Sequence, residues 1–145
     1  ILHVDGVGRK YLYQTAGCSL YPATEETVKA RKHFIHQDGQ HVFKYAVSNM
    51  ADVSAEIMER NNLKAEDIAY LIPHQANLRI IDATARRMGL STDKVLIDIE
   101  KYGNTGGTSI ALALWDFKKR FNKGDKLIFS AFGAGFTWGS IYYRW

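Results

Sequence analysis

The stretch Ile68-Ala69-Tyr70-Leu71-Ile72-Pro73-His74-Gln75-Ala76-Asn77 decides the fold of this chain. Its first five residues form an unbroken apolar run of strand length, which is typical of a strand buried on both faces. Pro73 to Ala76 then form a tight connection, and Asn77 is a suitable N-cap for a helix that closes at Gly89. A buried strand that leads directly into a helix favours an α/β fold.

Similar patterns on both sides of this unit predict the remaining elements. Helical spacing of apolar residues predicts a long helix over 39–61 and another over 108–121. Residues 17–32 are mostly polar, contain Pro22, and indicate a loop or excursion. Short strands are expected at 1–7, 11–15, 95–99, 126–131 and 136–145. We therefore expect one domain in which helices pack on a mixed five-stranded sheet, with its last two strands antiparallel.

Composition limits the classes of function. The chain has 145 residues, of which 46% are hydrophobic, so a single globular domain over residues 1–145 is expected. No apolar run reaches the roughly 18 residues of a membrane span. The net charge of +4 favours an acidic partner over nucleic acid. Cys18 is the one cysteine, which fits a reducing, cytoplasmic location. The chain begins at Ile1 inside an expected strand, so we interpret it as a fragment.

Three candidate features follow the carboxyl ends of expected strands, where open α/β sheets place their sites. They are His74, Asn104 and the Gly133-Ala134-Gly135 turn. Taken alone, each has an ordinary structural explanation, because a single histidine, a turn asparagine and a close-approach glycine are all common. Together they supply two side-chain N–H donors and a loop of backbone donors. That combination is what stabilisation of an oxyanion requires.

Three segments resemble one enzyme family in order and spacing. Residues 72–81, 102–105 and 131–140 are similar to the C-terminal half of the β-ketoacyl-acyl carrier protein synthases III. The resemblance implies half of a thiolase-like fold, whose active site lies between two related halves. The nucleophilic cysteine would come from the N-terminal half, which is absent here. By match, His74 and Asn104 are the catalytic residues of this half, and Ala134 supplies a backbone N–H to a second oxyanion.

The resemblance also implies the reaction and its participants. A short acyl-CoA acylates the cysteine, and malonyl-acyl carrier protein then undergoes a decarboxylative Claisen condensation, with no cofactor and no metal. The expected partners are acyl carrier protein, the N-terminal half, and a second copy of the full-length enzyme. Residues matching the substrate tunnel are Gly39, Phe43, Ala76, Asn77 and Phe132. Residues matching the carrier-docking surface are Lys44, Gln75, Ala76, Asn77, Leu78, Arg79, Arg86 and Arg87.

Several other interpretations can be weighed from the residues. Cys18 precedes a loop with no helix start to lower its pKa, which disfavours a nucleophile. His33, His36 and His41 lack a fourth zinc ligand at a familiar spacing. Gly133-Ala134-Gly135 differs from a dinucleotide fingerprint, since a strand follows it. Two alternatives stay open. One is another thiolase-like enzyme, such as a chalcone-type or hydroxymethylglutaryl-CoA synthase, and the other is an inactive carrier-binding or structural half-domain.

Overall fold

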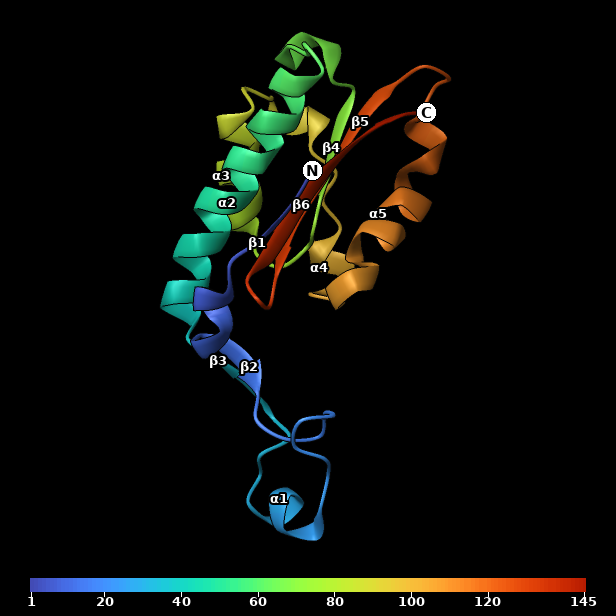
Figure 1. Cartoon of the computed structure of the whole chain (residues 1–145). Helices are drawn as coiled ribbons and strands as arrows, with labels where there is room; N and C mark the ends of the chain where they lie inside the picture. Colours follow the sequence, from blue (N-terminus) through green and yellow to red (C-terminus); the bar gives the residue numbers. More distant parts are fainter.

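The main body of the protein is built on a four-stranded mixed sheet. The computed structural model describes residues 1–145, and its sheet has the strand order β1-β6-β5-β4 (Figure 1). The buried strand β4 runs parallel to β5, while β5 and β6, and β6 and β1, are antiparallel. The strands are β1 (Leu2–Val4), β4 (Tyr70–Pro73), β5 (Lys126–Gly133) and β6 (Thr137–Arg144). The predicted mixed sheet and its antiparallel final pair are both confirmed.

Helices cover the two faces of this sheet. Helices α2 (Gly39–Arg60) and α3 (Leu78–Arg87) pack on one face, and α5 (Ser109–Phe117) packs on the other (Figure 1). Neighbouring residues of β4 point to opposite sides, so Leu71 joins the core beneath α2 and α3, while Ile72 joins the core beneath α5. Burial on both faces is what the uninterrupted apolar run of β4 predicted.

The helix boundaries follow from local hydrogen bonding. The Asp38 side chain accepts a hydrogen bond from the His41 N–H and begins α2. At the start of α3, the Asn77 side chain accepts a hydrogen bond from the Arg79 N–H at 2.9 Å. The predicted N-cap role of Asn77 is therefore confirmed. Gly89, at φ 69°, lies just beyond α3 in the left-handed conformation that ends many helices.

The strand predicted over 95–99 is wrong, and the main sheet has four strands where five were expected. Only Val95 forms a bridge with Leu71, and the Leu96 N–H donates to the Leu71 carbonyl at 2.9 Å. Val95 and Leu96 are buried, which explains the strand-like pattern, but the chain turns at Asp98 into the short helix α4 (Ile99–Tyr102). Pairing with β4 therefore ends at Leu96, too early for a strand to form, although Asp98 is buried as well.

The amino-terminal third differs most from the expectation. Residues 11–15 were predicted as a strand, and β2 (Leu12–Gln14) forms there, but it pairs with β3 (Ile35–Gln37) and not with the main sheet. We call residues 12–37 the arm, because they extend away from the body as a hairpin with the short helix α1 (Glu25–Lys29) at the far end (Figure 1). The expected excursion over 17–32 is confirmed, whereas β3 was missed.

The base of the arm is tied closely to the body. The Asp38 N–H donates to the Tyr11 carbonyl at 2.8 Å, and the Tyr11 ring stacks on His41 with centroids 4.4 Å apart. Between β1 and β2, the 3-10 helix Gly6–Lys10 brings Gly8 against the Phe136 ring. A Cβ at Gly8 would overlap that ring, so this contact requires glycine.

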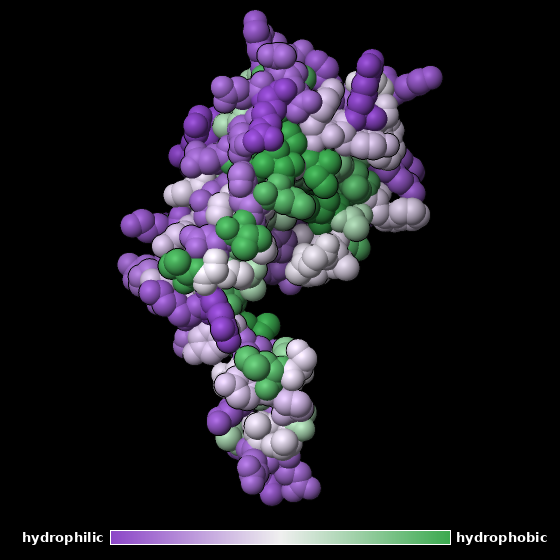
Figure 2. Space-filling view, in the orientation of Figure 1, coloured by the Kyte–Doolittle hydropathy of each residue, from purple (hydrophilic) through white to green (hydrophobic).

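One face of the sheet is only half covered. Leu2, Val4, Ile141 and Tyr143 lie on the α5 side of β1 and β6, beyond the reach of α5, and all four are exposed. We call these four residues the apolar face. Figure 2 shows a patch of hydrophobic residues over the middle of the body at this place. None of the helices is both long enough and apolar enough to cross a membrane.

Candidate active site

The parallel pairing of β4 with β5 brings two of the three predicted features to one edge of the sheet. Pro73 pairs with Ser130, and the His74 N–H donates to the Ser130 carbonyl at 2.7 Å. His74 therefore lies directly beside β5, three residues before that strand ends at Gly133. This convergence was expected, because neighbouring parallel strands end at the same edge.

His74 opens onto a cavity of about 550 Å³. The walls come from β5, including Phe132 and Gly133, from the neighbouring strands β1 and β6, and from Gly106, Gly107 and Ser109 at or just before the start of α5. The structure thus brings His74 and the predicted tunnel residue Phe132 to one cavity. Asn104, Ala134, Gly39, Phe43, Ala76 and Asn77 are outside its lining.

The side chain of His74 is largely withdrawn from solvent. Its Nδ1 lies 2.6 Å from the hydroxyl oxygen of Ser109, and its Nε2 has no hydrogen-bond partner in the chain. Burial lowers the pKa of His74 below the ordinary histidine value. The imidazole is therefore neutral near pH 7, with one ring nitrogen protonated and the other able to accept.

Asn104 is held by its own loop. Its side-chain oxygen accepts a hydrogen bond from the Gly106 N–H at 3.0 Å, while its amide nitrogen has no partner in the chain. The preceding residue, Gly103, has φ 68° and ψ −158°, a conformation that needs glycine. Gly106 lines the His74 cavity, so Asn104 is hydrogen-bonded to the cavity wall without lining it, and its side-chain N–H groups are free to donate.

Ala134 lies in the exposed turn between β5 and β6. Its carbonyl accepts a hydrogen bond from the Thr137 hydroxyl at 2.9 Å, and its N–H has no acceptor within the chain. The turn starts at Gly133, which lines the cavity. A backbone donor is therefore available next to the site that the sequence predicted, although the Ala134 side chain itself does not form part of the wall.

Gln75 must be removed from the predicted carrier-docking residues. Its side chain is fully buried, and docking requires exposure. Its amide nitrogen donates to the carbonyls of Pro73 and Leu96 at 2.9 and 3.1 Å, and its oxygen accepts from the Asp98 N–H. Gln75 is therefore a structural link beneath the His74 loop.

The other predicted docking residues lie on the outer surface of α2 and α3. We call Lys44, Arg79, Arg86 and Arg87 the basic face, and all four are exposed. The Arg79 guanidinium lies over the Phe43 ring, 4.6 Å from its centroid, which joins a predicted docking residue to a predicted tunnel residue. Arg87 is within 3.4 Å of Asp52, so part of its charge is neutralised. Asn77 and Leu78 are exposed, as is Gly39, while Ala76 is half-buried.

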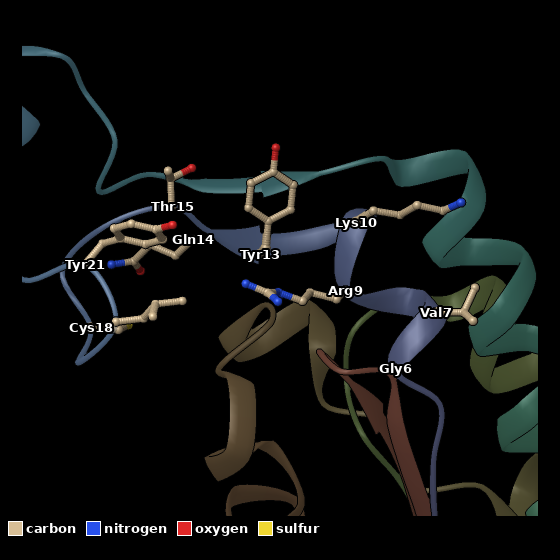
Figure 3. Close-up of a pocket in the computed structure, with 10 residues that line it drawn as sticks. Gly6, Val7, Arg9, Lys10, Tyr13, Gln14, Thr15, Cys18 and Tyr21 are labelled. Atoms are coloured by element: carbon tan, nitrogen blue, oxygen red, sulfur yellow. The ribbon is translucent and has the colours of Figure 1, made fainter.

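A second hollow of about 640 Å³ lies between the Gly6–Lys10 turn and the arm (Figure 3). In Figure 3 the Arg9 guanidinium points along the hollow towards Cys18, while Tyr13 and Lys10 point away. Cys18 is exposed, and this hollow shares no lining residue with the His74 cavity. Cys18 therefore has no histidine or asparagine of the predicted site beside it.

The three histidines considered as zinc ligands do not form a cluster. His33 is hydrogen-bonded to Thr27 at 2.9 Å, and His41 is hydrogen-bonded to Asp38 at 2.8 Å. His36 packs against the Tyr13 ring with centroids 4.7 Å apart. Ser109, in contrast, is a contact of His74 that sequence reasoning missed, because a serine at the start of a helix has a common capping explanation.

Comparisons with known proteins agree with this geometry. A β-ketoacyl-[acyl-carrier-protein] synthase III of Porphyromonas gingivalis is 52% identical over 145 residues, covering 100% of this chain and 43% of that protein. The enzyme of the same name from Chlorobium phaeobacteroides is 55% identical over 147 aligned residues, covering 99% of this chain and 45% of that protein. The crystal structure of the Thermus thermophilus β-ketoacyl-[acyl carrier protein] synthase III matches with a TM-score of 0.86 and 38% identity, covering 100% of this chain and 44% of that one.

The fold and the loops at the sheet edge define a class, the α/β halves of thiolase-like condensing enzymes. Within that class, the chain belongs to the family described as 3-oxoacyl-[acyl-carrier-protein (ACP)] synthase III C terminal, whose model matches residues 58–145. It spans less than half the length of the curated relatives it matches.

Proposed function

We propose that the protein containing this chain is a condensing enzyme that initiates fatty acid synthesis, and that this chain is its C-terminal half. The observation that carries the proposal is the placement of His74. It is buried enough to be neutral, it opens onto a cavity, and its Nε2 is unpartnered. Asn104, with a free amide nitrogen, is hydrogen-bonded to Gly106, which lines the same cavity.

The chemistry assigned to these donors is stabilisation of an enolate. When the malonyl group of malonyl-acyl carrier protein loses carbon dioxide, the electron pair of the broken C–C bond moves into an enolate, whose thioester oxygen becomes negative. The Nε2–H of His74 and an amide N–H of Asn104 would hold that oxygen. Each such donor is worth about 3–4 kcal/mol of activation free energy. Because both donors are anchored before the substrate binds, little reorganisation is needed during the reaction.

The second step joins the two carbon chains. The enolate carbon attacks the acyl-thioester on the cysteine of the other half, a C–C bond forms, and the tetrahedral intermediate expels the cysteine thiolate. The Ala134 N–H, which lacks an acceptor in this chain, would hold the oxyanion of that intermediate together with a donor from the cysteine-bearing half. The reaction then needs no cofactor and no metal, since both substrates are activated thioesters.

The basic face is the proposed docking surface for acyl carrier protein. Positive side chains on α2 and α3 would attract an acidic partner and orient it before contact. The contact between Arg79 and Phe43 supports a tunnel for the pantetheine chain that would run from this surface towards the cavity, past Gly39, Ala76, Asn77 and Phe132. We also propose that the N-terminal half covers the apolar face, that the full-length enzyme is a homodimer, and that it works in the cytoplasm.

The test uses the full-length protein with acetyl-CoA and malonyl-acyl carrier protein. His74→Ala should abolish malonyl decarboxylation while transfer of the acetyl group to the cysteine continues. His36→Ala, which alters an exposed histidine of the arm, is the matched control and should retain both steps. Unchanged decarboxylation in His74→Ala would reject the proposal. The 145-residue chain alone should form no β-ketoacyl product, because Cys18 is the one cysteine and lies outside the cavity.

A further inference from the structure

A buried serine hydroxyl lies against the ring of His74. Ser109 is the first residue of α5, only 2% of it is exposed, and its oxygen is 2.6 Å from His74 Nδ1. This is a short contact between two polar atoms withdrawn from water. One of the two must donate the proton, and the direction of donation fixes which ring nitrogen of His74 is protonated.

The neighbouring hydrogen bond decides that direction. The Gln75 N–H donates to the Ser109 oxygen at 3.2 Å, and His74 is the one other hydrogen-bond partner of this hydroxyl. If His74 donated from Nδ1, the serine oxygen would accept twice and its own proton would be buried without an acceptor, at a cost of about 1–3 kcal/mol. If the serine donates to Nδ1, every polar group at this contact is satisfied.

We propose that Ser109 is a positioning residue that holds His74 in the tautomer protonated on Nε2. This rests on the function proposed above, because it assigns the donor that the enolate would contact. With Nδ1 occupied as an acceptor, the remaining ring proton is on Nε2, the nitrogen that has no partner in the chain. The same contact fixes the plane of the ring and so the direction in which the proton points.

The fold supports this contact from two sides. The backbone of His74 is fixed to β5 through its N–H bond to the Ser130 carbonyl, and its side chain is fixed to α5 through Ser109. Ser109 also lies at the amino-terminal end of α5, where the partial positive charge of the helix opposes protonation of the second ring nitrogen. The imidazole is thus held as a neutral, oriented donor before any substrate arrives.

The tautomer is measured directly by ¹⁵N nuclear magnetic resonance of the full-length protein labelled at histidine, with His74→Gln used to assign the signal. The expected spectrum has a protonated Nε2 and an unprotonated Nδ1 that accepts a hydrogen bond. A protonated Nδ1 in the wild-type protein would overturn the proposal. This measurement needs no variant at Ser109 and no substrate, so it stands whether or not such a variant folds.

A kinetic experiment compares Ser109→Ala with Ser109→Thr, which retains the hydroxyl. Ser109→Ala should show a mixture of tautomers and about 10- to 100-fold slower decarboxylation, because the donor is less well oriented. Acyl transfer to the cysteine should be unaffected, and Ser109→Thr should recover most of the loss. Thr108→Ala is the matched control, since its hydroxyl bonds to the Thr105 carbonyl on the same turn and not to His74.

The possible outcomes separate this proposal from the one it rests on. Normal decarboxylation and an unchanged tautomer in a folded Ser109→Ala protein would overturn the positioning role, even if His74→Ala is inactive. Equal losses in Thr108→Ala and Ser109→Ala would also overturn it, because they would indicate general loosening of the turn. Full activity of His74→Ala would instead reject the proposed function.

Discussion

The side-chain oxygen of Gln75 accepts a hydrogen bond from the Asp98 N–H at 3.1 Å, and both residues are buried. This bond ties the His74 loop to the segment that leads, through α4, to the Asn104 loop. The Gln75 amide nitrogen adds a second connection, because it donates to the Leu96 carbonyl at 3.1 Å. The relative placement of the two proposed donors therefore depends on a side chain that contacts no substrate.

Gln75→Ala is expected to destabilise the protein by about 2–4 kcal/mol, because it leaves buried backbone groups without partners. It should also slow malonyl decarboxylation, since the His74 and Asn104 loops lose their link. Urea unfolding and the decarboxylation rate measure the two effects. Gln40→Ala, at an exposed position of α2, is the matched control and should change stability by less than about 0.5 kcal/mol. Similar stabilities for the two variants would contradict the role of Gln75.

A buried serine pair joins α2 to β5. The hydroxyl groups of Ser54 and Ser130 lie 2.8 Å apart, and both residues are almost completely buried. Ser54→Ala should cost about 1–3 kcal/mol, because the Ser130 hydroxyl loses its partner. Ser54→Ala combined with Ser130→Ala should cost less than the sum of the single changes, as a double-mutant cycle in urea unfolding will measure. If the losses in unfolding free energy of the two single variants simply add up in the double variant, the two hydroxyls do not interact.

Because burial lowers the pKa of His74, the folded protein should protonate this ring at lower pH than the unfolded chain does. In the unfolded chain, the His74 ring gains its proton at about pH 6.5. Acidification through that value therefore favours the unfolded state, and the effect ends only below the pKa of the folded state. Nuclear magnetic resonance titration of His74, with the same protein in urea as reference, tests the sign. A higher midpoint in the folded protein would contradict it.

The exposed apolar face predicts the behaviour of the 145-residue chain when it is produced alone. Contact between apolar faces of two copies would remove Ile141 and Val4 from water, so the chain should self-associate. Ile141→Lys should shift it towards monomer in size-exclusion chromatography with light scattering. Val28→Lys, at an exposed apolar residue of α1 in the arm, is the control and should have a smaller effect. If Ile141→Lys and Val28→Lys shifted the chain towards monomer equally, the apolar face would not be the surface through which copies associate.

Local sequence signals were sufficient for the body of the fold. The apolar run of β4, the Asn77 cap and the long amphipathic pattern of α2 each depend on near neighbours, and each was predicted correctly. His74 was identifiable for the same reason, since it directly follows β4. Asn104 was expected to follow a strand over 95–99, but it follows the short helix α4.

The errors arose where partners are distant in the sequence. Ile35–Gln37 is a strand only because Leu12–Gln14 lies beside it, and its own side chains are exposed. Val95 is buried like a strand residue, but burial does not show whether strand pairing continues beyond it. Gln75 was assigned to the docking surface by the match to the family, and not from its own surroundings. Its three buried backbone partners could be known only from the folded chain.

The closed base of the arm has an evolutionary consequence. Since Tyr11 and Asp38 are hydrogen-bonded to each other, the chain leaves and re-enters the body at adjoining points. Lengthening a loop with fixed ends costs little, about 0.6 kcal/mol for each doubling. Insertions and deletions can therefore accumulate between these residues while the register of β1, β6, β5 and β4 is preserved. The arm is therefore the part of this chain where a change of length should disturb the main sheet least.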